Sequence, residues 1–132
     1  MEYRVRAERI DVNGSLAFAK TAQVLPGADL AGRDDAFDAV NLMLAAVAAC
    51  MIKDAQRVAP MLAFTFDGVE VALEVTRQNT PPKLEKISQQ IVVRPEETAD
   101  RLTLLNRNMP KHGTILNTLA PAVPLEGTIG LG

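Results

Sequence analysis

The chain has 132 residues, of which 48% are hydrophobic and 23% charged, and its formal net charge is −2 at pH 7. A chain of this length and balance is expected to fold as one globular domain, residues 1–132. The small net charge argues against nucleic acid and against an anionic membrane surface as partners.

The cysteine usage and the apolar segments bound the cellular setting. Cys50 is the single cysteine, so an intramolecular disulfide is excluded. The apolar run at 42–52 is shorter than the roughly 18 residues that suggest a membrane span. The first residues lack the apolar core of a signal peptide. We therefore expect a cytoplasmic protein that keeps its thiol reduced.

The N-terminal elements are predicted to be strands. Residues 2–10 alternate between apolar and charged side chains, which is typical of a strand with one solvated face. Asn13-Gly14 predicts a tight hairpin turn, and a second strand is expected over 15–25. Residues 26–32 are predicted to form a loop.

A long helix is predicted next. Asp35 is its expected N-cap, and Asp38 adds a second carboxylate near the positive end of the helix. The helix should end at about Ala59, because the residue before a proline is disfavoured in helical geometry. Its middle, 42–52, is apolar all round, which predicts burial on every side. The chain has too little other helix to cover both faces, so we expect a second subunit, that is, a homodimer.

The second half is predicted to repeat strands and then helix. Strands are expected over 69–76 and 84–93, with Thr80-Pro81-Pro82 between them and a bulge near 84–87. A final strand is expected at 123–131. Strands, helix, strands, helix and strand make an α+β protein of antiparallel sheet.

Two helices are predicted between these strands. Pro95 with Glu96 and Glu97 should open the first, which carries an apolar stripe. The stripe consists of Leu102, Leu105 and Met109. A short helix is expected over 114–119.

Cys50 is the residue at which covalent chemistry is most readily expected. A thiolate is the reactive form of cysteine, and on a helix Lys53 and Arg57 share its face and would favour that form. The alternative is that Cys50 is a small core residue, since unpaired cysteines are among the most buried residue types. The sequence leaves both interpretations open.

Other residues offer little chemistry. The single histidine, His112, excludes multi-histidine metal sites and is expected at the surface after a Pro-Lys turn. The sequence contains no glycine-rich phosphate loop, so we expect neither a cofactor nor a metal. Asn41 is either a polar pocket residue or a partner of the neighbouring backbone. Arg101 and Arg107 are expected to be solvated charges on a helix face.

The stretch Leu44–Met51, Leu-Ala-Ala-Val-Ala-Ala-Cys-Met, resembles the peroxidatic-cysteine helix of the OsmC/Ohr superfamily, the osmotically inducible and organic hydroperoxide resistance proteins. The stretches at 66–71, 81–84 and 91–93 are similar to the second sheet and hairpin of that family, and 98–131 is similar to its C-terminal end. The resemblance implies an α+β, OsmC-like fold: antiparallel sheets wrapped around a long buried central helix in an intertwined homodimer.

The resemblance also implies a chemistry. Active members reduce organic hydroperoxides with two cysteines, an arginine and a glutamate; the first cysteine becomes a sulfenic acid. Cys50 stands at the position of that cysteine. Gly113 stands where the second, resolving cysteine is usual, and Val40 stands where the glutamate is usual. Arg33 is the nearest candidate for the arginine.

Two functions are therefore expected. The first is a one-cysteine, thiol-dependent peroxide reductase or redox sensor of the oxidative stress response, with Cys50, Arg33 and Lys53 as catalytic residues and an external thiol as reductant. The alternative is a catalytically degenerate OsmC-like protein that binds a small apolar ligand beside Cys50 or has a structural role.

Overall fold

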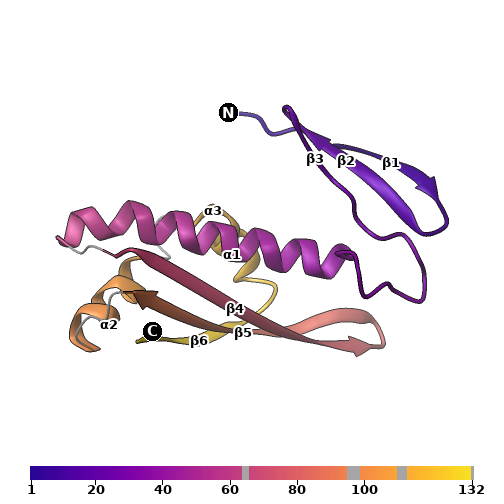
Figure 1. Cartoon of the computed structure of the whole chain (residues 1–132). Helices are drawn as coiled ribbons and strands as arrows, with labels where there is room; N and C mark the ends of the chain where they lie inside the picture. Colours follow the sequence, from indigo (N-terminus) through magenta and orange to yellow (C-terminus); the bar gives the residue numbers. More distant parts are fainter. Residues whose placement is uncertain (64–65, 95–98, 110–112, 132) are drawn as a thin grey trace. The chain divides into compact units, whose positions relative to one another are not determined.

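The computed structural model describes residues 1–63, 66–94, 99–109 and 113–131. The chain divides into two compact units, Met1–Ala45 and Ala46–Gly132 (Figure 1). The helix α1 (Ala39–Val58) runs from the first unit into the second.

The N-terminal unit contains one antiparallel sheet of β1 (Arg6–Asp11), β2 (Gly14–Ala19) and β3 (Ala22–Val24), in that order. The predicted hairpin is confirmed, and the carboxylate of Asp11 accepts hydrogen bonds from the backbone of the turn. The predicted strand over 15–25 is two strands, because a turn at Lys20 reverses the chain. Lys20 adopts a φ of 56° there, and no glycine or proline signals the turn in the sequence.

The start of α1 corrects the predicted N-cap. Oδ1 of Asp38 accepts from the backbone N–H of Asn41 at 3.0 Å, and Oδ1 of Asn41 accepts from the backbone N–H of Asp38 at 3.1 Å. This reciprocal pair is a capping box, in which two otherwise unsatisfied donors are bonded. Asp35 is not the cap, because its carboxylate is paired with Arg33. Of the two expectations for Asn41, the bond to neighbouring backbone is confirmed.

The C-terminal unit is built on a sheet in the order β4 (Gly68–Asn79), β5 (Pro82–Arg94) and β6 (Leu125–Leu131). β4 and β5 are antiparallel, and their register shifts after Thr76, which confirms the predicted bulge. β6 runs parallel to β5, so the sheet is mixed rather than wholly antiparallel. The physical reason is the helical connection between β5 and β6, because a crossover of that kind returns the chain in the same direction.

The core of this unit lies between the sheet and the helices. The 3-10 helix η1 (Ala59–Leu62) continues α1, and α2 (Ala99–Asn108) and α3 (Thr114–Leu119) connect β5 to β6. The second half of α1 belongs to this unit and runs along one face of the sheet (Figure 1). The predicted stripe on α2 is confirmed as buried. The buried cluster comprises Val47, Met51, Ala55, Val58, Ala59, Ile91, Val93, Leu102, Leu105, Met109 and Leu116.

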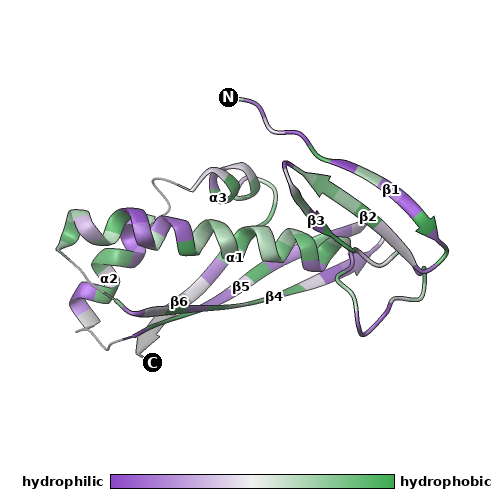
Figure 2. Ribbon diagram, turned by 45° about the horizontal axis from the view of Figure 1, so that its top comes forward, coloured by the Kyte–Doolittle hydropathy of each residue, from purple (hydrophilic) through white to green (hydrophobic). Residues whose placement is uncertain are grey.

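Only one side of α1 is buried in the single chain. Val47, Met51 and Val58 are buried, whereas Ala46 and Ala49 are exposed. A single sheet can cover only one face of a helix, so the expectation of burial on every side, which requires a second subunit, remains a prediction. Figure 2 shows that the middle of α1 is nevertheless hydrophobic.

By length and composition alone, the stretch Ala39–Leu62 is long and apolar enough to cross a membrane. The apolar run at 42–52 was too short to predict such a span. Core helices pass the same test, and the face of α1 that carries Val47, Met51 and Val58 does pack in the core of the C-terminal unit.

Arg101 corrects another expectation. Its Nη2 donates to the carbonyl oxygens of Leu62 at 3.2 Å and Ala63 at 2.9 Å, where η1 ends. A cation at a helix C-terminus satisfies carbonyl groups that lack helical partners. The predicted helix start at Pro95–Glu97 and the surface position of His112 lie outside the described residues.

Candidate functional site around Cys50

Cys50 lies on α1 and is partly buried against the core cluster. Its thiol donates a hydrogen bond to Oδ2 of Asp54 at 3.5 Å. The two residues are four apart on the helix, and that spacing places them on the same face. Asp54 is only 2% exposed and is the buried charged residue among those described. The thiol therefore has a buried acidic neighbour.

Gly113 packs close to the carboxylate of Asp54. It is buried and immediately precedes α3. A Cβ at position 113 would lie 2.8 Å from Oδ2 of Asp54 and 3.0 Å from Cδ1 of Leu116. Contacts this short are not tolerated without movement, so the absence of a side chain at 113 allows α3 to approach the carboxylate.

The predicted cationic neighbours of Cys50 are placed differently from the acid. Lys53 and Arg57 are on the same helix, as the spacing predicts, and both are exposed. Exposed charges interact weakly in water, whereas the carboxylate of Asp54 is desolvated and in contact. The described polar contact of the sulfur is with Asp54, and a catalytic role for Lys53 remains a prediction.

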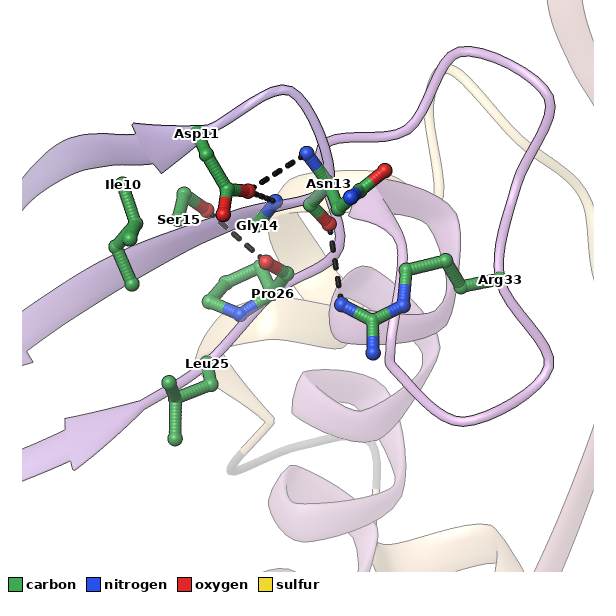
Figure 3. A pocket seen from close by; sticks show the side chains of 8 residues that line it. All are labelled: Ile10, Asp11, Asn13, Gly14, Ser15, Leu25, Pro26 and Arg33. Carbon is green, nitrogen blue, oxygen red and sulfur yellow. Dashed lines mark hydrogen bonds between the residues drawn. The ribbon is translucent and has the colours of Figure 1, made fainter.

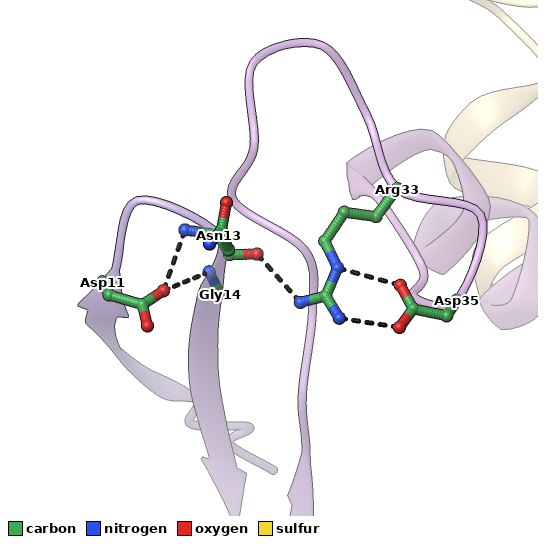
Figure 4. Close-up of polar contacts among 5 residues, drawn as sticks. All are labelled: Asp11, Asn13, Gly14, Arg33 and Asp35. Atoms are coloured by element: carbon green, nitrogen blue, oxygen red, sulfur yellow. Dashed lines mark hydrogen bonds and ion pairs between the residues drawn. The ribbon is translucent and has the colours of Figure 1, made fainter.

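Arg33 belongs to the N-terminal unit, where it holds a loop together (Figure 4). Its Nε and Nη2 donate to the two carboxylate oxygens of Asp35 at 2.9 and 2.8 Å, and Nη1 donates to the carbonyl oxygen of Asn13 at 3.2 Å. The bidentate hydrogen bond and the charge of Arg33 hold the pKa of the Asp35 carboxyl below its usual value. The same pair raises the pKa of Arg33. These contacts do not test the predicted role of Arg33 as a catalytic arginine, which remains a prediction.

A hollow of about 410 Å³ opens beside this arginine within the N-terminal unit (Figure 3). The hydroxyl of Ser15 in its wall donates to the carbonyl oxygen of Pro26 at 3.2 Å. Its lining consists of Ile10, Asp11, Asn13, Gly14, Ser15, Leu25, Pro26 and Arg33. Three of the five N–H groups of Arg33 already donate hydrogen bonds, so the guanidinium mainly holds in place the loop that lines the hollow.

Within the ranges that the structure describes, no three His, Cys, Asp or Glu side chains gather into a group that could hold a metal ion. The chemistry that the described site can offer is that of one thiol and one carboxylate. Asp54 was overlooked as a site residue in the sequence, although its spacing from Cys50 was visible. The signal was an acid at the position that continues the apolar stripe of Val47, Met51 and Val58 along the helix, since such a group is rarely buried without a specific partner.

The fold and the site together define an α+β protein with a single, helix-borne thiol. A family model described as OsmC-like protein matches residues 32–127, and the chain belongs to this family. The OsmC-like protein of Mycoplasma pneumoniae is similar in structure, with 17% identity, a TM-score of 0.90, and coverage of 99% of this chain and 97% of that one.

Two further solved structures are similar. One is an organic hydroperoxide resistance protein OsmC from Legionella pneumophila, with 16% identity, a TM-score of 0.78, and coverage of 98% of this chain and 97% of that one. The other is the organic hydroperoxide resistance protein OhrB of Bacillus subtilis, with 10% identity, a TM-score of 0.69, and coverage of 100% and 98%. At these identities the shared property is the fold. Comparison with curated proteins gave no match.

Proposed function

We propose that this OsmC-like protein is a one-cysteine, thiol-dependent reductase of organic hydroperoxides or a peroxide sensor. The observation that carries the proposal is the position of Cys50: the residue lies at the edge of the core, is only partly buried, and has its thiol hydrogen-bonded to a polar group. The names of structural neighbours, organic hydroperoxide resistance proteins, support the same chemistry. The proposed catalytic residues are Cys50, Lys53 and Arg33.

The reaction proceeds in two steps. The sulfur of Cys50, after losing its proton, attacks the terminal oxygen of the hydroperoxide. The S–O bond forms while the O–O bond breaks, and the departing alkoxide takes up a proton and leaves as an alcohol. The sulfur is oxidised by two electrons to a sulfenic acid. An external low-molecular-weight thiol then displaces water from the sulfenic sulfur, and a second thiol releases Cys50. We place this reaction in the cytoplasm, where such thiols are kept reduced.

The test is turnover of cumene hydroperoxide in the presence of excess dithiothreitol. Formation of cumyl alcohol should be catalysed by the unaltered protein and should be lost in Cys50→Ser. The same rate in both proteins would contradict the proposal. Lys53→Gln and Arg33→Gln then test the two proposed supporting cations separately.

One observation favours a second function. The Cys50 thiol donates its proton in a hydrogen bond to Asp54, and the residue packs against the buried core cluster. A protein in which Cys50 stays neutral would be a catalytically degenerate OsmC-like protein that binds a small apolar ligand or has a structural role. A Cys50 thiol that remains unmodified in a large excess of hydroperoxide would select this function.

We also propose that the protein is a homodimer. Residues 1–45 are all described, and none of them is buried. The apolar side chains exposed there are Met1, Tyr3, Val5, Ile10, Val12, Val24, Leu25, Leu30 and Phe37. A three-stranded sheet without a core of its own is not stable by itself in water. A second copy of the chain, which offers the exposed alanines of α1 and the same uncovered sheet, is the partner that would bury both surfaces.

A further inference from the structure

We propose that Lys53 and Arg57 select the reductant of Cys50: they favour an external thiol that carries a negative charge in addition to its thiolate. This selection rests on the proposed function, because it concerns the oxidised cysteine. The attraction of anions to the reduced cysteine does not depend on that function.

The first support is the position of the two cations on α1. Lys53 follows Cys50 by three residues and Arg57 by seven, and at these spacings side chains lie on one face of a helix. Cys50 is partly buried, whereas Lys53 and Arg57 are exposed. A small molecule that reaches Cys50 along this face of the helix therefore meets two long, positively charged side chains.

The second support is that no acid neutralises these charges. The ion pairs among the described residues are made by other side chains. From Cys50 to the end of α1 the exposed residues are Lys53, Gln56 and Arg57, and the acid between them, Asp54, is buried. This part of α1 therefore presents positive charge to the solvent.

The cations are also separate from the alanines on which the proposed dimer rests. The exposed alanines of α1 end at Ala49, one helical turn before Lys53. Helices that pack at a crossing angle are closest at one point and diverge from it. A crossing at the alanines thus leaves Lys53 and Arg57 at the rim of the contact, where a small molecule can reach them.

The reduction step is where this charge matters. The chain has one cysteine, so another molecule must reduce the sulfenic acid of Cys50. A thiol attacks as its thiolate. The new S–S bond forms as the S–O bond breaks, and the hydroxide that leaves takes up a proton to become water. A second thiolate attacks the reductant's sulfur in this mixed disulfide and releases Cys50. The two reductant molecules together lose two electrons and leave as a disulfide.

Positive charge beside the sulfur raises the local concentration of an anion and the rate at which it arrives. A thiol with an additional carboxylate or sulfonate is attracted by one more unit of charge than a neutral thiol. The preference is expected to be modest, about two- to threefold for each cation, because water and salt screen exposed charges.

The experiment compares the unaltered protein with Lys53→Gln and Arg57→Gln, each of which removes one positive charge and keeps a long polar side chain. Both positions are exposed, and circular dichroism confirms that the variants are folded. Arg107→Gln is the matched control, because it removes one positive charge from an exposed position on α2.

The first readout is alkylation of reduced Cys50 by iodoacetate, an anion, and by iodoacetamide, which is neutral. Both reagents react with the same thiolate, so the ratio of their rate constants is independent of the fraction of thiolate. The iodoacetate-to-iodoacetamide ratio should fall about two- to threefold in Lys53→Gln and in Arg57→Gln, and should be unchanged in Arg107→Gln. In the unaltered protein it should also fall when NaCl is raised from about 0.01 M to about 1 M.

The second readout is reduction of the sulfenic acid that cumene hydroperoxide forms on Cys50. The reductants are 2-mercaptoethanesulfonate, which carries the additional charge, and neutral 2-mercaptoethanol, and dimedone trapping with mass spectrometry measures the sulfenic acid that remains. The intrinsic reactivities of the two thiols cancel when the ratio of their rate constants is compared between proteins. This ratio should fall about two- to threefold in both α1 variants and stay constant in Arg107→Gln.

The outcomes separate this proposal from the proposed function. An unchanged reduction ratio in Lys53→Gln and Arg57→Gln would overturn the selection of an anionic reductant, while formation of the sulfenic acid would still support the proposed function. Absence of any oxidation of Cys50 in the unaltered protein would overturn the proposed function. In that case a lower alkylation ratio in the variants would still support the attraction of anions to Cys50, and an unchanged ratio would overturn it.

Discussion

Gly113 lies so close to Asp54 that a side chain at position 113 could not be added without moving the carboxylate or the first turn of α3. A Cβ there would stand 2.8 Å from Oδ2 of Asp54, and 3.0 Å and 3.1 Å from two atoms of Leu116. The glycine is required here by close approach and not by its backbone angles, since its φ is −84°. The site around Cys50 therefore depends on a residue that carries no functional group.

Gly113→Ala should lower the free energy of unfolding by about 1–3 kcal/mol, the usual cost of overpacking a tight contact. Urea denaturation measures this. Gly68→Ala is the control, because the nearest atom to a Cβ at position 68 is 4.0 Å away. In an Asp54→Ala background the cost of Gly113→Ala should shrink. A cost that stays the same would show that Leu116, and not the carboxylate, sets the limit at position 113.

Arg101→Ala should lower the free energy of unfolding by about 1–2 kcal/mol, because the carbonyl oxygens of Leu62 and Ala63 would lose a charged donor. Arg107→Ala is the matched control on the same helix, since Arg107 is exposed. Its effect should stay within about 0.5 kcal/mol. Equal effects of the two substitutions would mean that the contacts of Arg101 contribute nothing to stability.

The pair of Arg33 and Asp35 predicts an acid-sensitive loop. Because the pKa of the Asp35 carboxyl is lowered in the folded chain, the pair adds stability above about pH 4, and this contribution disappears as the pH falls through the lowered value. Titration of the carboxyl by NMR should give a higher midpoint in Arg33→Gln. Arg33→Lys should be intermediate, since lysine keeps the charge and loses the bidentate hydrogen bonds. An unchanged midpoint in Arg33→Gln would refute the pairing in solution.

The proposed homodimer predicts the effect of a charge on the exposed face of α1. Ala49 is exposed in the single chain, so Ala49→Asp costs little there and would be buried only by a partner. Sedimentation at micromolar concentration should show a dimer for the unaltered protein and a weaker dimer or an unfolded chain for Ala49→Asp. Asn117→Asp, on an exposed position of α3, should leave the dimer unchanged. A folded monomer of the unaltered protein would contradict the proposal.

The candidate site was only half predictable from the sequence. Cys50 could be identified because it is the only cysteine and lies in a helix of known family resemblance. Lys53 was chosen as its neighbour from the spacing alone, but spacing does not distinguish an exposed residue from a buried one. The packing of the sheet and α3 against one side of α1 buries Asp54 and leaves Lys53 exposed to solvent.

By itself, the sequence determined the local elements: the hairpin at Asn13-Gly14, the bulge in β5, the apolar stripe on α2 and the extent of α3. These features depend on side-chain periodicity and turn chemistry within a few residues, so the sequence pattern predicts them. Only the tertiary structure decided that β6 runs parallel to β5, that α1 buries one face, and that Gly113 meets Asp54. Such contacts join segments far apart in the chain, and their geometry follows from how the elements pack together, which no local pattern specifies.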